Sequence, residues 1–190
     1  MNRPLTHQIE ANRKSEYATG EDFRRLFTEH VNRLYLLSFL LTANHETAER
    51  CFLTGLDECV RGSGVFQKWA RNWARRTIIR NAIRLIEPQV NPARTVSSAC
   101  HSSGEIDFPT MSVQDAQFEN VLALGDFERF VYVISVLEKW SDQDSASLLD
   151  VSLQDVREAR TRAFQLIANY SRAVVVPTND SSDVLNRRIR

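Results

Sequence analysis

Residues 141–170, SDQDSASLLDVSLQDVREARTRAFQLIANY, decide how the fold of this chain is interpreted. The stretch is typical of a short helix, a tight turn and a longer helix. Ser141 with Asp144, and Ser152 with Asp155, are two capping-box-like helix starts, in which a hydroxyl caps the amides of the first turn. The chain must therefore reverse direction between the two starts.

The apolar spacing across this reversal is that of a helix-turn-helix. Ala146 is small where the two helices would touch, Asp150 falls at the turn, and Val156 is apolar where the second helix packs back. Three further apolar residues fit the pattern: Leu149, Val151 and Ala159. An ordinary helical hairpin with a solvated outer face has the same spacing, so the pattern leaves both interpretations open.

The second helix of this unit has two distinct faces. Apolar residues share one face at helical spacing: Val156, Ala159, Ala163, Leu166, Ile167 and Tyr170. Polar residues occupy the opposite face: Gln154, Arg157, Glu158, Thr161, Arg162 and Gln165.

The composition of the chain indicates an all-α protein. Its 190 residues include only six glycines and five prolines, and no long run of alternating β-branched residues precedes Ala173. The formal net charge is zero, so any surface for nucleic acid must be local. Residues 65–87 hold a local excess of positive charge, with one lysine and five arginines against Glu87 alone.

The positions of helical periodicity and of helix-ending residues predict two small helical domains joined by a flexible linker. Residues 21–41, 46–61 and 65–87 have the periodicity of three helices, and Pro88 ends the last of them. Two more helices, 113–124 and 126–139, precede the helix-turn-helix. The second of these is expected to bury one stripe: Phe127, Phe130, Val131, Ile134 and Leu137. The predicted segments are a flexible leader (1–20), a first domain (21–88), a linker bearing Pro, Gly and Ser (89–112), a second domain (113–173) and a tail (174–190).

Several classes of protein are disfavoured by the same sequence. The polar start and the short apolar run at 34–41 predict neither a signal peptide nor a membrane span, so we expect a cytoplasmic protein. The three cysteines, Cys51, Cys59 and Cys100, have the spacing of neither a disulfide framework nor a metal site, and no cofactor motif occurs. No catalytic constellation is visible either. His30, His45, Asp57 and Glu58 are interpreted as parts of solvated helix faces, and the protein is not expected to be an enzyme.

The predicted third helix combines aromatic and basic residues on one side. Trp69, Trp73, Arg76, Arg80 and Arg84 follow one another in steps of three or four residues. Aromatic rings stack on unpaired bases and guanidinium groups bind phosphates, so this mixture suits single-stranded or distorted nucleic acid. The competing interpretation is that both tryptophans are buried core residues and the arginines are merely solvated.

The order of these pieces resembles that of the extracytoplasmic-function sigma factors of bacterial RNA polymerase. EDFRRLFTEHVNRLYLLSFLLTANHETAE, residues 21–49, is similar to the start of sigma region 2. FQKWARNWARRTIIRNAIR, residues 66–84, resembles the Trp-rich promoter-melting helix of that region. GDFERFVYVISVLEKWSDQDSASLLDVSLQDVREARTRAFQLI, residues 125–167, resembles region 4. The resemblance covers residues 21–87 and about 122–170.

The resemblance implies a specificity subunit that binds core RNA polymerase and promoter DNA, with an anti-sigma protein as a further partner. Polymerase binding falls on the predicted second helix at Glu49, Arg50, Leu53 and Thr54. The melted promoter element falls on Trp69, Trp73, Arg76, Arg80 and Arg84. The upstream element falls on Gln154, Arg157, Glu158, Thr161 and Arg162. The chain departs from the family at Arg50, where the family has an acidic residue, and at Leu53 and Thr54, where it has a glutamine–acid pair.

Two other functions remain open at this point. The departures at the polymerase-binding positions favour a degenerate sigma-like protein that pairs with a regulator instead of initiating transcription. The same helical periodicity also allows a helix-turn-helix transcriptional regulator that does not engage polymerase and has an unrelated helical domain in front.

Overall fold

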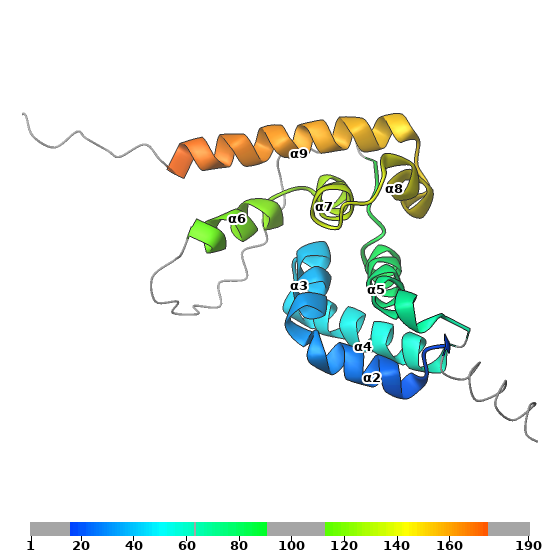
Figure 1. Cartoon of the computed structure of the whole chain (residues 1–190). Coiled ribbons are helices and arrows are strands. Elements are labelled where there is room, and N and C mark those ends of the chain that lie inside the picture. Colours follow the sequence, from blue (N-terminus) through cyan, green and yellow to red (C-terminus); the bar gives the residue numbers. More distant parts are fainter. Residues whose placement is uncertain (1–15, 63, 91–112, 175–190) are drawn as a thin grey trace, which may run out of the picture.

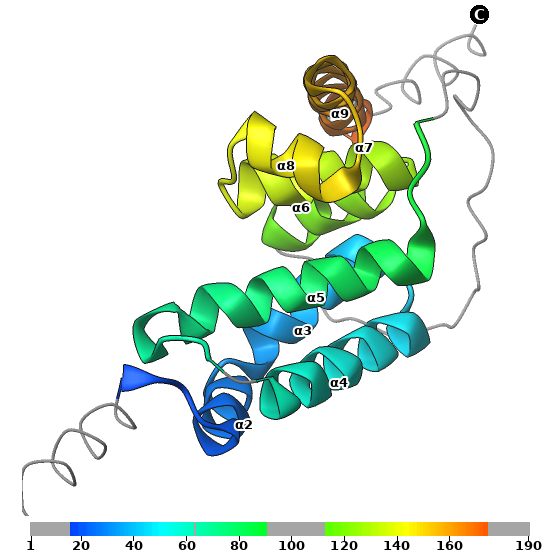
Figure 2. The same cartoon turned by 90° about the vertical axis from the view of Figure 1, so that its right-hand side faces the viewer.

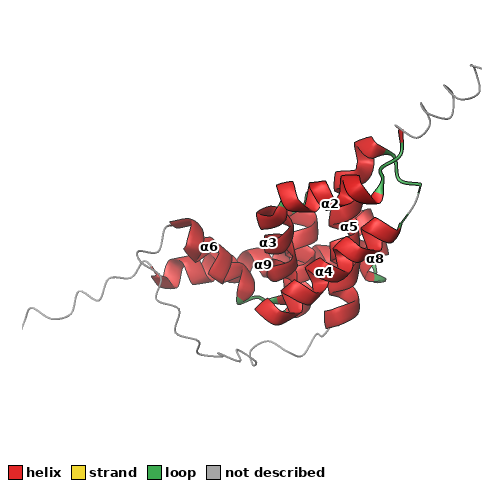
Figure 3. Ribbon diagram, turned by 90° about the horizontal axis from the view of Figure 1, so that it is seen from below, coloured by secondary structure: helices red, strands yellow, loops and turns green. Residues whose placement is uncertain are grey.

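The computed structural model describes residues 16–62, 64–90 and 113–174 of the chain. All regular elements in these ranges are helices, as Figure 3 shows, and the one β contact is an isolated antiparallel bridge between Tyr17 and Phe66. The all-α prediction is therefore confirmed. Most of the predicted leader, linker and tail lies outside the described residues.

The N-terminal half of the described chain is built from four α-helices and a short 3-10 helix. They are α2 (Gly20–Glu29), α3 (Val31–Thr42), α4 (His45–Arg61), η1 (Gln67–Trp69) and α5 (Ala70–Ile86). The single helix predicted for 21–41 is wrong, because the chain bends at His30, whose φ and ψ are −117° and 21°. The bend lets Phe23 and Phe27 of α2 and Leu34 of α3 all face the core, while Val31 beside the bend is exposed.

The C-terminal half contains α6 (Val113–Leu122), α7 (Asp126–Tyr132), the π-helical turn η2 (Val133–Leu137), α8 (Asp142–Leu149) and α9 (Leu153–Val174). In Figure 1, α9 runs along the outer side of the other helices of this half. The prediction that Leu137 is buried is wrong. The π-turn, closed by the amide of Glu138 donating to the carbonyl of Val133 at 2.9 Å, shifts the helical phase and leaves Leu137 exposed.

The two halves share one hydrophobic core. Figure 2 shows the C-terminal helices stacked on the layer formed by α3 and α5. Phe127, Phe130 and Ile134 belong to the same buried cluster as Leu37 and Leu41 of α3. Within the N-terminal half, α4 and α5 approach closely at Gly55, where a Cβ atom would lie 3.0 Å from Cγ1 of Ile78.

A buried arginine joins the halves at the centre of their contact. Arg129 of α7 is only 4% exposed. Its guanidinium donates to the carbonyl of Leu41 in α3 at 3.3 Å, to the carbonyl of Leu124 at 3.0 Å and to Oδ1 of Asp126 at 2.5 Å. Burial lowers the pKa of Arg129, and the charge of Asp126 opposes that shift. An arginine nevertheless stays protonated at neutral pH, so the cation is held by two carbonyls and a carboxylate.

Two further polar contacts cross the same boundary from α5. Arg75 forms an ion pair with the largely buried carboxylate of Glu138. The guanidinium of Arg76 lies over the ring of Trp140, with its carbon 5.6 Å from the ring centroid. The basic side of α5 is therefore also part of the surface on which the C-terminal half rests.

We expect Arg129→Met to lower the free energy of unfolding by about 2 kcal/mol. The variant removes the cost of burying a charge, but it leaves the carbonyls of Leu41 and Leu124 without this donor in a buried position. Urea denaturation measures the change. Arg24→Met, which breaks an exposed ion pair with Glu21 within α2, is the control and should change stability by less than about 0.5 kcal/mol. Equal effects of the two variants would contradict the role given to Arg129.

The buried thiols give a second expectation. Cys51 and Cys59 are free and fully buried, and burial raises the pKa of each to about 11. In a Cys100→Ser background, an aromatic disulfide reagent at pH 8 should react with these two thiols only on unfolding. In the unfolded chain the thiols have a pKa of about 8.5, so they lose their protons at a lower pH than in the folded protein. The free energy of unfolding should therefore fall as the pH rises from about 8.5 toward 11. Rapid modification of the native protein would contradict this.

Candidate nucleic-acid interface

The helix-turn-helix predicted from the sequence is present in α8 and α9. The amide of Asp144 donates to Oγ of Ser141 at 3.0 Å, and the amide of Asp155 donates to Oγ of Ser152 at 3.1 Å. At the turn, Asp150 adopts the left-handed conformation, with φ 55° and ψ 46°. The two caps and the turn therefore have the geometry that the serine and aspartate spacing predicts.

The packing between the two helices also follows the predicted pattern. Ala146 of α8 and Val156 and Ala159 of α9 are buried. Tyr170, the last residue of the predicted apolar face of α9, is 39% exposed. It lies near the C-terminal end of α9, where Figure 1 shows only α6 alongside, so fewer neighbours cover it.

The outer face of α9 carries the predicted base-reading residues, but they bond to one another and to the rest of the half. The side-chain amide of Gln154 donates through Nε2 to Oε1 of Glu158 at 2.8 Å, and Oγ1 of Thr161 donates to the backbone carbonyl of Arg157 at 2.9 Å. Arg162 turns toward α7, where its Nε donates to Glu128 at 2.9 Å. The side chain of Arg162 is half-buried. The other four predicted residues are exposed: Gln154, Arg157, Glu158 and Thr161.

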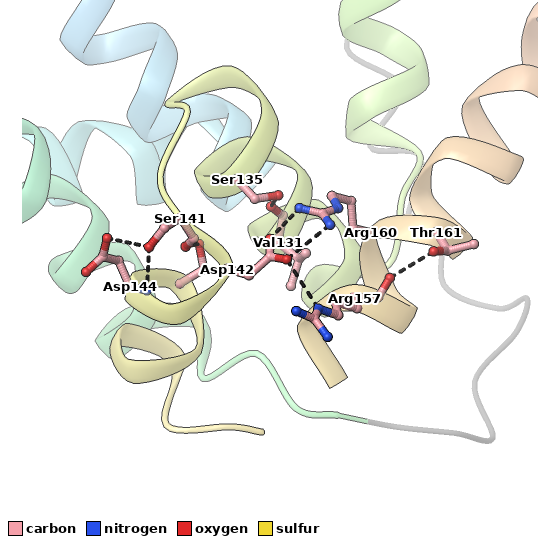
Figure 4. Close-up of polar contacts among 9 residues, drawn as sticks. Val131, Ser135, Ser141, Asp142, Asp144, Arg157, Arg160 and Thr161 are labelled. Atoms are coloured by element: carbon pink, nitrogen blue, oxygen red, sulfur yellow. Dashed lines mark hydrogen bonds and ion pairs between the residues drawn. The ribbon is translucent and has the colours of Figure 1, made fainter. Parts of the chain in front are cut away.

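One carboxylate holds two arginines of α9. Asp142, in the first turn of α8, lies 3.5 Å from Nε of Arg157 and accepts two hydrogen bonds from the guanidinium of Arg160 (Figure 4). Residues 115–172 contain ten acidic and six basic residues, so the half that bears the helix-turn-helix is acidic overall. Arg157, Arg160 and Arg162 of α9 therefore all have a nearby carboxylate.

The surface formed by η1 and α5 differs from that of α9. Its tryptophans are exposed, and one of its cations has no carboxylate partner among the described residues. Trp69 and Trp73 are 53% and 40% exposed, so the interpretation that they are core residues is wrong. Arg80 is exposed, and no carboxylate among the described residues pairs with it. The other two predicted residues have partners within the protein. Arg76 lies over Trp140, and Arg84 donates to Glu58 at 2.8 Å.

The sequence did not predict that two other aromatic residues, Tyr17 and Phe66, form a cluster with Trp69. Tyr17 lies within the predicted leader, yet its ring stacks on Phe66 at 4.6 Å between centroids. Phe66 in turn meets Trp69 edge-on at 5.2 Å. Helical periodicity cannot detect this cluster, because two of its three rings precede the helices that it joins.

The predicted polymerase-binding residues lie together on the outer side of α4. Glu49, Arg50, Leu53 and Thr54 are all exposed, whereas Ala48, Cys51, Gly55 and Cys59 on the opposite side are buried. Leu53 is thus an apolar side chain set among charged and polar ones. In the part of the chain that the structure describes, no three His, Cys, Asp or Glu side chains form a metal-binding group, and no helix is long and apolar enough to cross a membrane.

Comparison with known proteins gives a distant structural likeness. No protein-family model matches the chain, and no curated protein matches it. Among solved structures, it is similar to the sigma factor RpoE in a co-crystal structure with the anti-sigma factor NepR from Bartonella quintana. The alignment covers 80% of this chain and 98% of that chain, with 17% identity and a TM-score of 0.46.

The left-handed turn residue yields a prediction about the helix-turn-helix. We expect Asp150→Gly to raise the free energy of unfolding by about 0.5 kcal/mol, because glycine adopts a positive φ without steric cost. The same change at the exposed helical residue Ser147 should lower it by about 0.5 kcal/mol. Urea denaturation of the two variants checks the signs. Destabilisation by both substitutions would mean that the turn does not impose this conformation in solution.

Proposed function

We propose that this protein is a sigma-like transcription initiation factor that binds core RNA polymerase and promoter DNA. Its direct chemistry is binding: stacking of unpaired bases, neutralisation of phosphates and contacts to base edges. In this proposal the protein is not an enzyme and uses no cofactor. Core polymerase and promoter DNA are its main partners, and an anti-sigma protein is a further one.

The exposure of Trp69, at the end of η1, and of Trp73, in α5, is the observation that carries the proposal. Tryptophan is usually covered by other side chains, and here two of them are exposed on η1 and α5, whereas Ala74 and Ile78 of α5 are buried. Residues 59–86 contain seven basic and no acidic residues. Exposed rings amid an excess of positive charge suit a negatively charged strand with unstacked bases.

The helix-turn-helix supplies a second, weaker contact in this proposal. Arg157 is exposed and lies at the longer of the two distances from Asp142, so it can exchange that carboxylate for DNA at little cost. Arg160 is bonded through both terminal nitrogens and stays with Asp142. We therefore assign upstream-element contacts to Gln154, Arg157 and Thr161, with most of the phosphate affinity coming from α5.

The exposed side of α4 is the proposed polymerase contact. Leu53 provides an apolar centre, with Glu49, Arg50 and Thr54 around it. Arg50 favours an acidic group on the partner, because charges across an interface must be complementary. Run-off transcription with purified bacterial core polymerase and a library of genomic fragments tests the whole proposal. Specific transcripts that require this protein support it, and failure to co-purify with core polymerase overturns it.

The tryptophans give a prediction that DNA binding alone can check. In fluorescence anisotropy, the double variant Trp69→Ala, Trp73→Ala should bind a bubble-containing promoter fragment about 30-fold more weakly or worse, because each of two stacked bases contributes roughly 1–3 kcal/mol. Its affinity for fully paired DNA should not change. Phe164→Ala removes another exposed aromatic side chain, on α9, and serves as the control. An equal loss on paired and bubble DNA would contradict base stacking.

A second function is favoured by one observation. Arg75 and Arg76 of α5 contact Glu138 and Trp140 of the C-terminal half. Three arginines of α9 are paired with carboxylates: Arg157, Arg160 and Arg162. A degenerate sigma-like module that binds a regulator protein through α4 would need none of these cations. Capture of a regulator without polymerase from native cells would support this function. A helix-turn-helix regulator without polymerase contact predicts instead that paired DNA is bound and that the tryptophan substitutions have no effect.

A further inference from the structure

The segment before α2 is fixed against the loop that leads into α5. The amide of Ala18 donates to the carbonyl of Val65 at 2.7 Å, and the Ala18 side chain is buried. Thr19 caps α2: its Oγ1 accepts from the amide of Asp22 at 3.2 Å, and its own amide donates to that carboxylate at 2.9 Å. Figure 2 shows this segment beside the loop. The position of Tyr17 is therefore fixed by the hydrogen bonds of Ala18 and Thr19, which follow it, and by its own bridge to Phe66.

Three aromatic rings form a continuous row at this place. The rings of Tyr17 and Phe66 stack at 4.6 Å with an interplanar angle of 22°, and Phe66 meets Trp69 at 5.2 Å and 87°. Nζ of Lys68 lies 5.0 Å from the Trp69 centroid and 5.8 Å from that of Phe66. The outer rings, Tyr17 and Trp69, are 39% and 53% exposed. Stacked rings held at the surface in one geometry lose little conformational freedom when a flat ligand binds.

The charges around the row favour a negatively charged ligand. Lys68 and Arg71 have no carboxylate partner among the described residues, and Arg71 instead bonds to Nε2 of His30 at 2.9 Å. Both belong to the 59–86 stretch that lacks acidic residues. In paired DNA the flat faces of the bases are covered by their neighbours, so only an unpaired nucleotide can combine a free ring face with a phosphate.

We propose that Tyr17, Phe66 and Trp69, with Lys68, form a binding site for an unpaired nucleotide of single-stranded DNA. Tyr17 extends the stacking surface of α5 beyond the residues that helical periodicity identifies. The inference rests on the proposed function, because Trp69 belongs to both surfaces. It adds a specific claim: a residue outside the helical domain predicted for 21–88 contacts the nucleic acid.

The test measures binding of a fluorescein-labelled ten-nucleotide oligothymidine by anisotropy, with thermal unfolding as the check on folding. Tyr17→Leu should weaken binding about tenfold, within the range found for loss of one base-stacking ring, whereas Tyr17→Phe should leave it unchanged. The slope of log affinity against log salt should stay the same in both variants and fall by about 0.7 in Lys68→Gln. Tyr170→Leu is the matched control, since Tyr170 is equally exposed, at 39%, on α9.

Two outcomes separate this inference from the proposed function. If wild-type protein binds the oligonucleotide, Trp73→Ala weakens binding and Tyr17→Leu does not, the inference is overturned and the proposed function stands. If wild-type protein binds no single-stranded DNA, both fail. Should Tyr17→Leu unfold, ultraviolet crosslinking of wild-type protein to an oligonucleotide containing 5-iodouracil decides instead. Crosslinks at Tyr17 support the site, and crosslinks that occur only at Trp73 overturn it.

Discussion

A buried cation, Arg129, bonds the two halves of the molecule to each other. Arg129 is buried, and its three hydrogen bonds reach α3, the end of the segment after α6 and the start of its own helix. A guanidinium in such a place must keep every partner, because a buried charge without partners costs several kcal/mol, roughly. The carbonyl of Leu41 also lies at the C-terminal end of α3, where the helix dipole favours a positive charge. Phe127 and Phe130 are buried on the same helix, in one cluster with Leu37 and Leu41 of α3.

Helix α5 contacts both halves of the molecule. Its buried side, including Ile78 and Ala82, belongs to the core, while Arg75 and Arg76 contact the C-terminal half. Any nucleic acid that binds along the whole of α5 must compete with Glu138 and Trp140 for these two side chains. The exposed tryptophans and Arg80 face no such competition. The accessible part of the proposed interface is therefore smaller than the row of residues on the helix, and it is richer in aromatic rings than in free positive charge.

Much of this structure was predictable from local chemistry in the sequence. Serine caps, the reversal at Asp150 and the burial of Val156 and Ala159 in α9 depend on residues a few positions apart, and these predictions are confirmed. The bend at His30 and the exposure of Leu137 were not predictable, because periodicity continues through both while tertiary packing and a π-turn change the phase. The pairing of Arg160 with Asp142, and of Arg75 with Glu138, joins residues 18 and 63 positions apart, which no pattern within one helix reveals. For the same reason the aromatic row that includes Tyr17 was invisible until the segment before α2 was placed.

The bond between Arg129 and Leu41 spans 88 residues of sequence. On a ribosome, the whole N-terminal half emerges before Arg129 is added to the chain, so α3 must present its carboxyl end to water for the time needed to make those residues. At roughly 5–20 residues per second, that wait is of the order of 4 to 18 seconds, far longer than a helix takes to form. The first half therefore needs enough buried surface of its own to persist, and the docking of the second half is a late event that closes a long loop. Contacts that close such loops form slowly, since their entropic cost precedes any stabilisation.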